Sequence, residues 1–423
     1  MTWYKGSFRY ICMSSLQPII PWKNVVFYKK SVYNTTSFGA TYEPWTHEYT
    51  NAEQELNNLR ERIFAYETED SGKWEYYKKV INPYELIFTQ RKYTNFPDSV
   101  CLLHPLSRSY FKMVEILSII DFFKTFERDD KIRSAHVCEG PGGFIEAIID
   151  ESEKRRKTVA QVTAMTLRPN QSNVPGWKRA TTFLQKHKQI KVTYGEDNTG
   201  NIINIPNQDE FVKVCGTKVH IFTSDGGFDF STDYLSQERF VFPLLLASTR
   251  IGFEVLKEGG FFVLKFFDVY HVGMRDLIYF LSCFFRTWTL YKPATSRPCN
   301  PEQYFIGRGF KGCPADALEN LKGWCQSVMD GHVPNSMCNG SRPEEFDACI
   351  NGIHDTMVTY QSHYLTQVFE KIENSTDDNI RSILRRHEYQ SYEWCKMFNV
   401  PIYPARTLSI EASQSDPRVA GRQ

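Results

Sequence analysis

Three segments of the chain place glycines or charged residues directly after short apolar runs. A glycine-rich loop follows the run Ser134–Cys138, an aspartate follows Val219–Ser224, and a lysine ends Phe261–Lys265. In an open α/β sheet, ligands bind at the edge formed by the carboxyl ends of the strands. If the runs are strands, Asp225, Lys265 and the glycines meet at one edge. A buried strand with a charged tip explains any single run equally well, but three such runs favour a site.

The glycine loop reads Cys138-Glu139-Gly140-Pro141-Gly142-Gly143-Phe144. Glycines let a backbone turn sharply and approach a ligand closely. The loop is not a phosphate loop, because no lysine follows it. It is also a poor dinucleotide fingerprint, because the glycine spacing differs and the expected carboxylate about 20 residues further on is missing. A glycine-lined pocket without a phosphate site suits S-adenosylmethionine, and the alternative is a purely structural tight turn.

The composition is that of a soluble globular protein. The chain has 423 residues, of which 41% are hydrophobic and 23% charged. Its net charge of +1 argues against a protein that coats nucleic acid non-specifically, although a local basic groove remains open. We expect no signal peptide and no membrane span, and therefore an intracellular protein whose 11 cysteines are free thiols. No Cys-x-x-Cys pair is present, so no metal site is expected.

Strands that alternate with helices predict an α/β fold with a doubly wound, mostly parallel sheet of seven strands. The expected strands are Ser134–Cys138, Gln161–Thr166, Lys191–Tyr194, Val219–Ser224, Phe261–Lys265, Thr287–Tyr291 and Gln303–Gly307. The expected helices are Thr46–Arg62, Arg108–Phe126, Gly143–Ile149, Ser236–Leu256 and Met274–Cys283. We expect Gly259-Gly260 to end the long helix before the next strand.

Extensions flank this predicted domain on both sides. Residues 1 to about 45 read as an irregular arm, and from Ala315 onward the chain reads as helical and polar. We therefore divide the chain into an arm with a helix (1–75), a catalytic domain (76–312), a helical extension (313–407) and a disordered tail (408–423).

Several motifs together identify a family. The glycine loop resembles the cofactor loop of FtsJ-type RNA ribose 2′-O-methyltransferases, which have a Rossmann-like fold. Within that group, the chain is most similar to the cap-specific mRNA (nucleoside-2′-O-)methyltransferases of eukaryotes and large DNA viruses. The likeness spans about residues 78 to 405, and its motifs are Asn82-Pro83-Tyr84-Glu85, Met165-Thr166-Leu167, Tyr194-Gly195-Glu196, Asp225-Gly226-Gly227-Phe228, Lys265 with Asp268, Lys292–Pro298 and Glu393-Trp394-Cys395.

The resemblance implies an enzyme that methylates the ribose 2′-hydroxyl of the first transcribed nucleotide of capped mRNA, with S-adenosylmethionine as methyl donor. It implies the catalytic residues Lys112, Asp225, Lys265 and Glu302. Lys265 would be the base, and Lys112 would lower its pKa. No metal is implied, because no phosphoryl group is transferred. Arg297 and Glu302 would contact RNA, and the cofactor would contact Ser107, Cys138, Glu139, Gly140, Pro141, Gly142, Gly143, Phe144, Asn201, Ile202 and Asp225.

The chain departs from the family at two of these positions, and two other functions stay open. Family members often have alanine in place of Glu139 and aspartate in place of Asn201. The alternatives are methylation of ribosomal or other RNA, and an inactive RNA-binding scaffold on the same fold. The implied partner is the 5′ end of capped mRNA, together with other capping or transcription proteins and without a membrane. The implied compartment is the nucleus or cytoplasm, or a viral factory or virion for a member from a large DNA virus.

Overall fold

A computed structural model describes residues 25–69, 71–89, 96–169, 176–227 and 236–404. Its main sheet contains the strands β1 (Tyr28–Lys29), β3 (Lys131–Val137), β4 (Thr158–Met165), β5 (Ile190–Thr193), β6 (Val219–Ser224), β7 (Leu256–Phe266), β8 (Phe285–Tyr291) and β9 (Gln303–Phe310).

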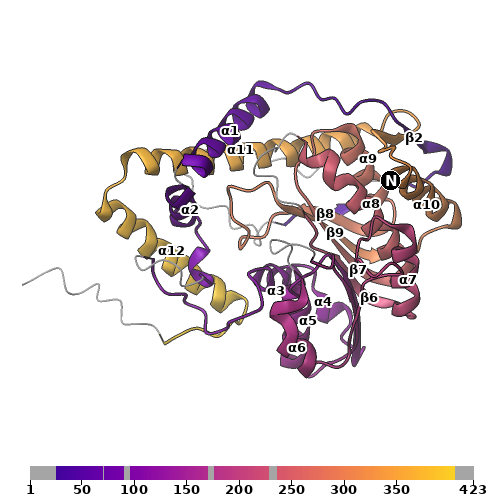
Figure 1. Ribbon diagram of the computed structural model, residues 1–423, viewed down its shortest axis with the longest axis horizontal. Helices are drawn as coiled ribbons and strands as arrows, with labels where there is room; N and C mark the ends of the chain where they lie inside the picture. The colour runs from indigo at the N-terminus through magenta and orange to yellow at the C-terminus, as the bar shows by residue number, and fades with distance from the viewer. Residues whose placement is uncertain (1–24, 70, 90–95, 170–175, 228–235, 405–423) are drawn as a thin grey trace, which may run out of the picture.

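The eight strands lie in the order β1-β8-β9-β7-β6-β3-β4-β5 (Figure 1). The pairs from β7 through β6, β3 and β4 to β5 are parallel, whereas β9 pairs antiparallel with β7 and β8. The seven predicted strands and the mostly parallel α/β sheet are confirmed. The eighth strand, β1, lies in the segment expected to be irregular, and it pairs with β8 through Tyr28 and Trp288.

Helices cover both faces of the sheet, because its central strands are apolar on both sides. In β7, Phe261 and Val263 face one helical layer, and Phe262 and Leu264 face the other. The first layer holds α3 (Ser109–Ile119), α4 (Phe122–Thr125), α5 (Gly143–Lys154) and α6 (Thr181–Lys186). The second holds α7 (Ile205–Cys215), α8 (Gln237–Val255), α9 (Val272–Ser282) and α10 (Ala315–Met329).

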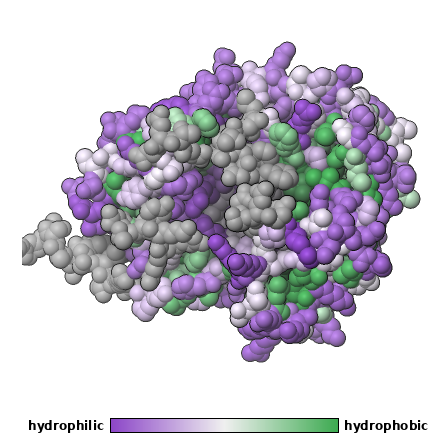
Figure 2. Space-filling model, viewed as in Figure 1, coloured by the Kyte–Doolittle hydropathy of each residue, from purple (hydrophilic) through white to green (hydrophobic). Residues whose placement is uncertain are grey.

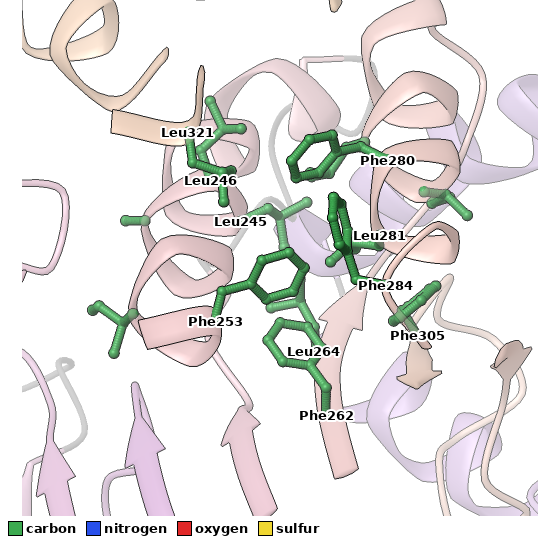
Figure 3. Close-up of a cluster of buried hydrophobic side chains, with 14 of the residues drawn as sticks. Leu245, Leu246, Phe253, Phe262, Leu264, Phe280, Leu281, Phe284, Phe305 and Leu321 are labelled. Carbon is green, nitrogen blue, oxygen red and sulfur yellow. The ribbon is translucent and has the colours of Figure 1, made fainter. Parts of the chain in front are cut away.

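The core of the second layer fixes the position of β7. Figure 3 shows side chains of α8, such as Leu245 and Phe253, meeting Phe262 and Leu264 of β7. Gly252 lets α8 approach the sheet, since a Cβ atom there would lie 2.4 Å from the ring of Phe262. This packing holds the strand whose carboxyl end carries Lys265.

Four helices form an extension beside the carboxyl edge of the sheet, at the left of Figure 1. They are α1 (Asn51–Glu69), α2 (Ser71–Val80), α11 (Glu344–Asn374) and α12 (Asp377–Met397). A second, two-stranded sheet pairs β2 (Phe38–Thr41) with β10 (Ser336–Cys338). Among the described helices, none has both the length and the apolar character needed to cross a bilayer.

Some predicted elements are wrong in detail. Gly259 and Gly260 do not separate helix from strand, because both lie inside β7, where the register with β6 shifts and Gly259 has a φ of 77°. The predicted helix Arg108–Phe126 is broken at Asp121, which has a φ of 52° and separates α3 from α4. The helix α7 is missing from the prediction because its start, with Pro206, is typical of a turn, although proline also fits a first helical turn. The tail from residue 408 lies outside the described residues.

Candidate active site

The carboxyl ends of three neighbouring parallel strands meet at one edge of the sheet. β3 leads into the glycine loop, β6 leads into Asp225, and Lys265 is the penultimate residue of β7. The register pairs Val137 with Ser224 and Ser224 with Leu264, so the residues just beyond them lie level with one another. β3 lies between β4 and β6, so the strand order reverses there. Open α/β sheets bind ligands at such switch points.

Two ion pairs lie at this edge and share one tyrosine. The Lys265 Nζ atom lies 3.2 Å from Asp225 Oδ1 and donates a hydrogen bond of 2.7 Å to the Asp225 carbonyl oxygen. The Lys112 Nζ atom lies 2.6 Å from Glu302 Oε1. The Tyr304 hydroxyl donates to Asp225 Oδ1 at 2.7 Å and accepts from Lys112 Nζ at 3.4 Å. The four residues predicted to be catalytic are therefore brought together in one network through Tyr304.

Separate elements supply the members of this network. Lys112 lies on α3, and Glu302 directly precedes β9. Lys265 of β7 is the direct cross-strand partner of Tyr304 of β9. Directly paired residues in an antiparallel ladder project to the same face of a sheet. The register of β7 and β9 therefore places the Tyr304 hydroxyl beside the Lys265 ammonium group.

The charges of the network contradict the prediction that the pKa of Lys265 is lowered. Burial lowers the pKa of Lys265, but the carboxylates of Asp225 and Glu302 raise it further, so the net pKa lies above the ordinary value of 10.5. The prediction that Lys112 lowers the pKa of Lys265 is wrong because Lys112 pairs with Glu302, whereas Lys265 contacts Asp225 directly. Burial raises the pKa of Glu302, but Lys112, Lys265 and Lys292 lower it to about 2. Lys265 is thus an ammonium group and Glu302 a carboxylate at neutral pH.

Lys292 holds the loop that carries Glu302. Its Nζ atom donates to the carbonyl and side-chain oxygens of Asn300, at 2.7 and 2.8 Å, and to the Glu302 carbonyl at 2.9 Å. Burial lowers the pKa of Lys292 to about 7. Three short hydrogen bonds to oxygen atoms nevertheless favour the protonated form, which has the three donors that they need. Lys292 therefore fixes the backbone on both sides of residue 301.

Arg297 lies in the same loop and is held by the Asn-Pro-Tyr-Glu motif. Its Nε and a terminal nitrogen each donate to a carboxylate oxygen of Glu85 at 3.1 Å. Glu85 is only 2% exposed and also pairs with Arg108 at 3.1 Å. Asn82 of the motif donates to Glu85 at 2.7 Å. Arg297 thus has a structural role in the loop, and its predicted contact with RNA stays a prediction.

Glycines shape the loop between β3 and α5. Gly142 has a φ of 109°, a conformation that other residues rarely adopt, and a Cβ atom on Gly143 would lie 2.3 Å from the hydroxyl oxygens of Ser107 and Ser109. The Gly140 amide donates to the Thr166 hydroxyl at 3.4 Å, so the loop contacts the end of β4. The predicted contacts Cys138 and Pro141 are half-buried in the loop.

The loop fits S-adenosylmethionine by its chemistry. A side chain at Gly143 would clash with Ser107 and Ser109, so glycine keeps the loop close to α3. The carboxyl groups of Glu139 within the loop and of Asp225 suit a positively charged ligand. Phe144 is fully buried, with its ring 5.9 Å from that of Tyr304, and is a core residue.

The remaining predicted cofactor residues lie near the same edge. A Cβ atom on Gly200 would lie 2.0 Å from the Thr166 carbonyl, so the segment after β5 packs against the end of β4. In this segment Asn201 is exposed and accepts a hydrogen bond from the Ile203 amide at 3.1 Å, whereas Ile202 is 1% exposed and belongs to the core. The side chain that faces solvent here is thus that of Asn201.

Sequence reasoning missed Tyr304 and the structural roles of Lys292 and Glu85. The chain has 23 tyrosines, and only the register of β7 and β9 distinguishes Tyr304 from the others. Lys292 and Glu85 lie in motifs that support the family resemblance. Their contacts are distant in sequence, however: Lys292 binds Asn300, 8 residues away, and Glu85 binds Arg108 and Arg297, 23 and 212 residues away. A motif match gives no information on such contacts.

Comparison with known proteins agrees with the motifs. Residues 105–310 match the FtsJ-like methyltransferase family. The chain is 32% identical over 254 residues to the cap-specific mRNA (nucleoside-2′-O-)-methyltransferase 1 of Xenopus laevis, which covers 55% of the chain and 28% of that protein. It is 27% identical over 249 residues to the protein of the same name from Trypanosoma brucei brucei, which covers 56% of the chain and 64% of that protein.

The matches span less than two thirds of the length of either relative. Among solved structures, a Plasmodium falciparum protein described as a ribosomal RNA methyltransferase aligns with a TM-score of 0.33 and 15% identity, over 49% of the chain and 99% of that protein. The family match confirms the FtsJ-like methyltransferase domain that the motifs indicate.

Proposed function

We propose that the FtsJ-like methyltransferase domain of this chain transfers a methyl group from S-adenosylmethionine to the ribose 2′-hydroxyl of the first transcribed nucleotide of capped mRNA. The observation that carries this proposal is the network of Lys112, Glu302, Lys265 and Asp225, joined through Tyr304 beside the glycine loop. The names of the curated relatives support capped mRNA as the substrate. We place this activity where capped transcripts are made, in the nucleus or cytoplasm.

The cofactor supplies an electrophilic methyl group on a positively charged sulfur. We assign its binding to the glycine loop, with Asp225 facing the positive charge and Asn201 at the exposed end of the pocket. The conformation of Gly142 and the close packing of Gly143 on Ser107 and Ser109 support this assignment.

The ribose hydroxyl must be oriented and must lose its proton as the methyl group arrives. We assign the removal of the hydroxyl proton to Lys265, whose Nζ atom is fixed by two oxygens of Asp225. The second pair, Lys112 with Glu302, would orient the ribose. Since Lys265 is protonated at neutral pH, its ammonium group must give up a proton in each turnover. Methyl transfer should therefore accelerate steadily as the pH rises towards the raised pKa of Lys265.

We place the RNA between the sheet edge and the helical extension. The loop between β8 and β9, which carries Arg297 and Glu302, reaches towards the extension in Figure 1. Figure 2 shows hydrophilic side chains along the left side of the recess at this position. RNA is commonly recognised through its backbone charge and its unstacked bases, which suits such a surface.

Methyl transfer to matched RNAs tests the proposal. Labelled S-adenosylmethionine is offered with one short RNA carrying either a methylguanosine cap or a bare 5′-triphosphate, and nuclease digestion locates the label. We expect label on the first nucleotide of the capped RNA only, and no label with Lys265→Ala. Equal labelling of both RNAs would favour ribosomal or other RNA as substrate. RNA binding without any transfer would favour an inactive scaffold.

A further inference from the structure

Glu139 is a buried carboxyl group inside the glycine loop, with only 3% of its surface exposed. The Thr223 hydroxyl donates to Glu139 Oε1 at 2.5 Å. The other oxygen, Oε2, is buried and has no hydrogen-bond partner among the residues that the structure describes. A buried polar atom without a partner is costly in a folded protein and calls for an explanation, such as a ligand that is bound in function.

The hydrogen bonds beneath Glu139 supply no positive charge. His136 of β3 pairs in register with Thr223 of β6, and its Nδ1 atom lies 2.8 Å from the Thr223 hydroxyl oxygen. Because Thr223 gives its proton to Glu139, it must accept from His136 Nδ1, which makes Nε2 the acceptor for the Ser134 hydroxyl at 2.8 Å. Burial lowers the pKa of His136 to about 3, so the imidazole is neutral. The chain of hydrogen bonds therefore ends at Glu139 without a counter-charge.

The catalytic network surrounds the other side of this carboxyl group. Burial, followed by the negative charge of Asp225, raises the pKa of Glu139 well above 4.5, and the opposing effects of Thr223, Lys265 and Lys112 are smaller. Glu139 therefore keeps its proton to higher pH than an ordinary glutamate does. The ionisable groups that face it are Asp225 after β6, Lys265 of β7, Lys112 of α3, Tyr304 of β9 and the adjacent Cys138.

We propose that Glu139 stores the proton of the reaction: it loses its proton when a cationic cofactor binds in the glycine loop and regains one when the methyl group is transferred. The proposal rests on the proposed function. A carboxyl group that ionises beside a cation matches the charge of S-adenosylmethionine and not that of its neutral-sulfur product.

The proton balance of methyl transfer supports this role. The reaction breaks an S–C bond and an O–H bond, forms a C–O bond and leaves one proton over. The proton leaves the hydroxyl at Lys265, and the network of Lys265 and Glu139 gains one proton in all, which ends on the Glu139 carboxylate. The ordinary pKa values of 10.5 and 4.5 would keep the proton on lysine by a factor of about a million; the raised pKa of Glu139 narrows this gap, and the raised pKa of Lys265 widens it. Glu139 ends neutral and releases its proton when the next cofactor binds.

Proton release on cofactor binding, measured without RNA, tests the proposal. S-adenosylmethionine is titrated into the full chain by calorimetry at pH 7, in two buffers with different ionisation enthalpies. We expect the wild type to release between roughly half a proton and one proton per cofactor bound. Glu139→Gln, which keeps the shape and cannot ionise, should release none and bind about tenfold more weakly at pH 8. S-adenosylhomocysteine should bind the two proteins within about threefold of each other.

Asp150→Asn is the matched control. Asp150 on α5 also has a pKa raised by burial, but it accepts its hydrogen bond from Tyr110, outside the network. On cofactor binding, the Asp150→Asn variant should release as many protons as the wild type. Proton release by Glu139→Gln equal to that of the wild type would overturn the proposal.

A second variant keeps the test decisive if Glu139→Gln fails to fold. Thr223→Val removes the hydroxyl that stabilises the carboxylate, so it should raise the pKa of Glu139 and move the rise of cofactor affinity to higher pH. If the affinity of Thr223→Val for the cofactor depended on pH as that of the wild type does, this would count against the proposal. A wild type that binds the cofactor with proton release but methylates no RNA would overturn the proposed function alone, whereas no cofactor binding at all would overturn both.

Discussion

The Tyr304 hydroxyl joins the two ion pairs, and Tyr304→Phe tests whether this link serves the chemistry. The tyrosine is fully buried, so phenylalanine keeps the packing while Asp225 Oδ1 loses a hydrogen bond of 2.7 Å. A hydrogen bond to a charged group contributes about 1.5–3 kcal/mol. If this bond orients Asp225 and Lys265 in the transition state, kcat should fall roughly 10- to 100-fold. Single-turnover methyl transfer to capped RNA measures the loss, and calorimetry should show unchanged affinity for the cofactor.

A neighbouring tyrosine provides the matched control. Tyr291 of β8 is the direct cross-strand partner of Tyr304, and its hydroxyl donates to the buried Glu115 outside the site. Tyr291→Phe should lower the free energy of unfolding by about 1.5–3 kcal/mol, as Tyr304→Phe should, but leave kcat within about twofold. Equal losses of kcat in the two variants, or full activity in Tyr304→Phe, would refute the reasoning and leave the hydroxyl a packing role.

Three other perturbations probe the base, the buried carboxylate and the loop. Lys265→Ala should abolish methyl transfer and leave cofactor affinity within about threefold, since a base acts in the transition state; an equal loss of affinity would show that Lys265 is structural. Burial raises the pKa of Glu85, but Arg108 and Arg297 lower it to about 2. Because this pKa lies below the ordinary 4.5, the Glu85 carboxylate stabilises the fold fully above pH 4.5, and this stabilisation is lost as the pH falls towards 2. The urea concentration at the unfolding midpoint should therefore fall between pH 4.5 and 2, and Glu85→Gln should make this pH dependence weaker. Arg297→Ala should lower the Tm because Glu85 loses a guanidinium partner, and it should raise the KM for capped RNA with a salt dependence shallower by about one phosphate contact. An unchanged KM would assign Arg297 to the loop alone.

The strands and the loop could be predicted because their signals are local. Val219–Ser224 is buried at every position, and a strand buried on both faces is rich in apolar residues, here Val219, Ile221 and Phe222. Gly142 has a backbone conformation that favours glycine, so the loop is visible in the residue types themselves. The motif around Lys265 indicated the strand end, and the structure places Lys265 there.

The charge state of the site could not be predicted in the same way. The pKa of Lys265 depends on which partner lies nearest, and the pairing of Lys112 with Glu302 spans 190 positions of sequence. Two neighbouring lysines lower each other's pKa only when no carboxylate lies close enough to raise it again. The bulge at Gly259 was missed for a related reason, because a glycine pair ends a helix or bends a strand according to its neighbours.

The helical extension contributes to the site through the segments that carry the network. Arg60 of α1 holds both carboxylate oxygens of Asp268, three residues after Lys265, at 2.9 Å each. Gln361 of α11 donates to the Cys299 carbonyl at 2.8 Å, three residues before Glu302, and accepts from Arg60. One buried guanidinium and one buried amide thus connect the two strand ends that supply the ion pairs. The spacing between Lys265 and Glu302 therefore depends on α1 and α11 as well as on the sheet, which is why residues far from the FtsJ-like domain in sequence belong to the support of its site.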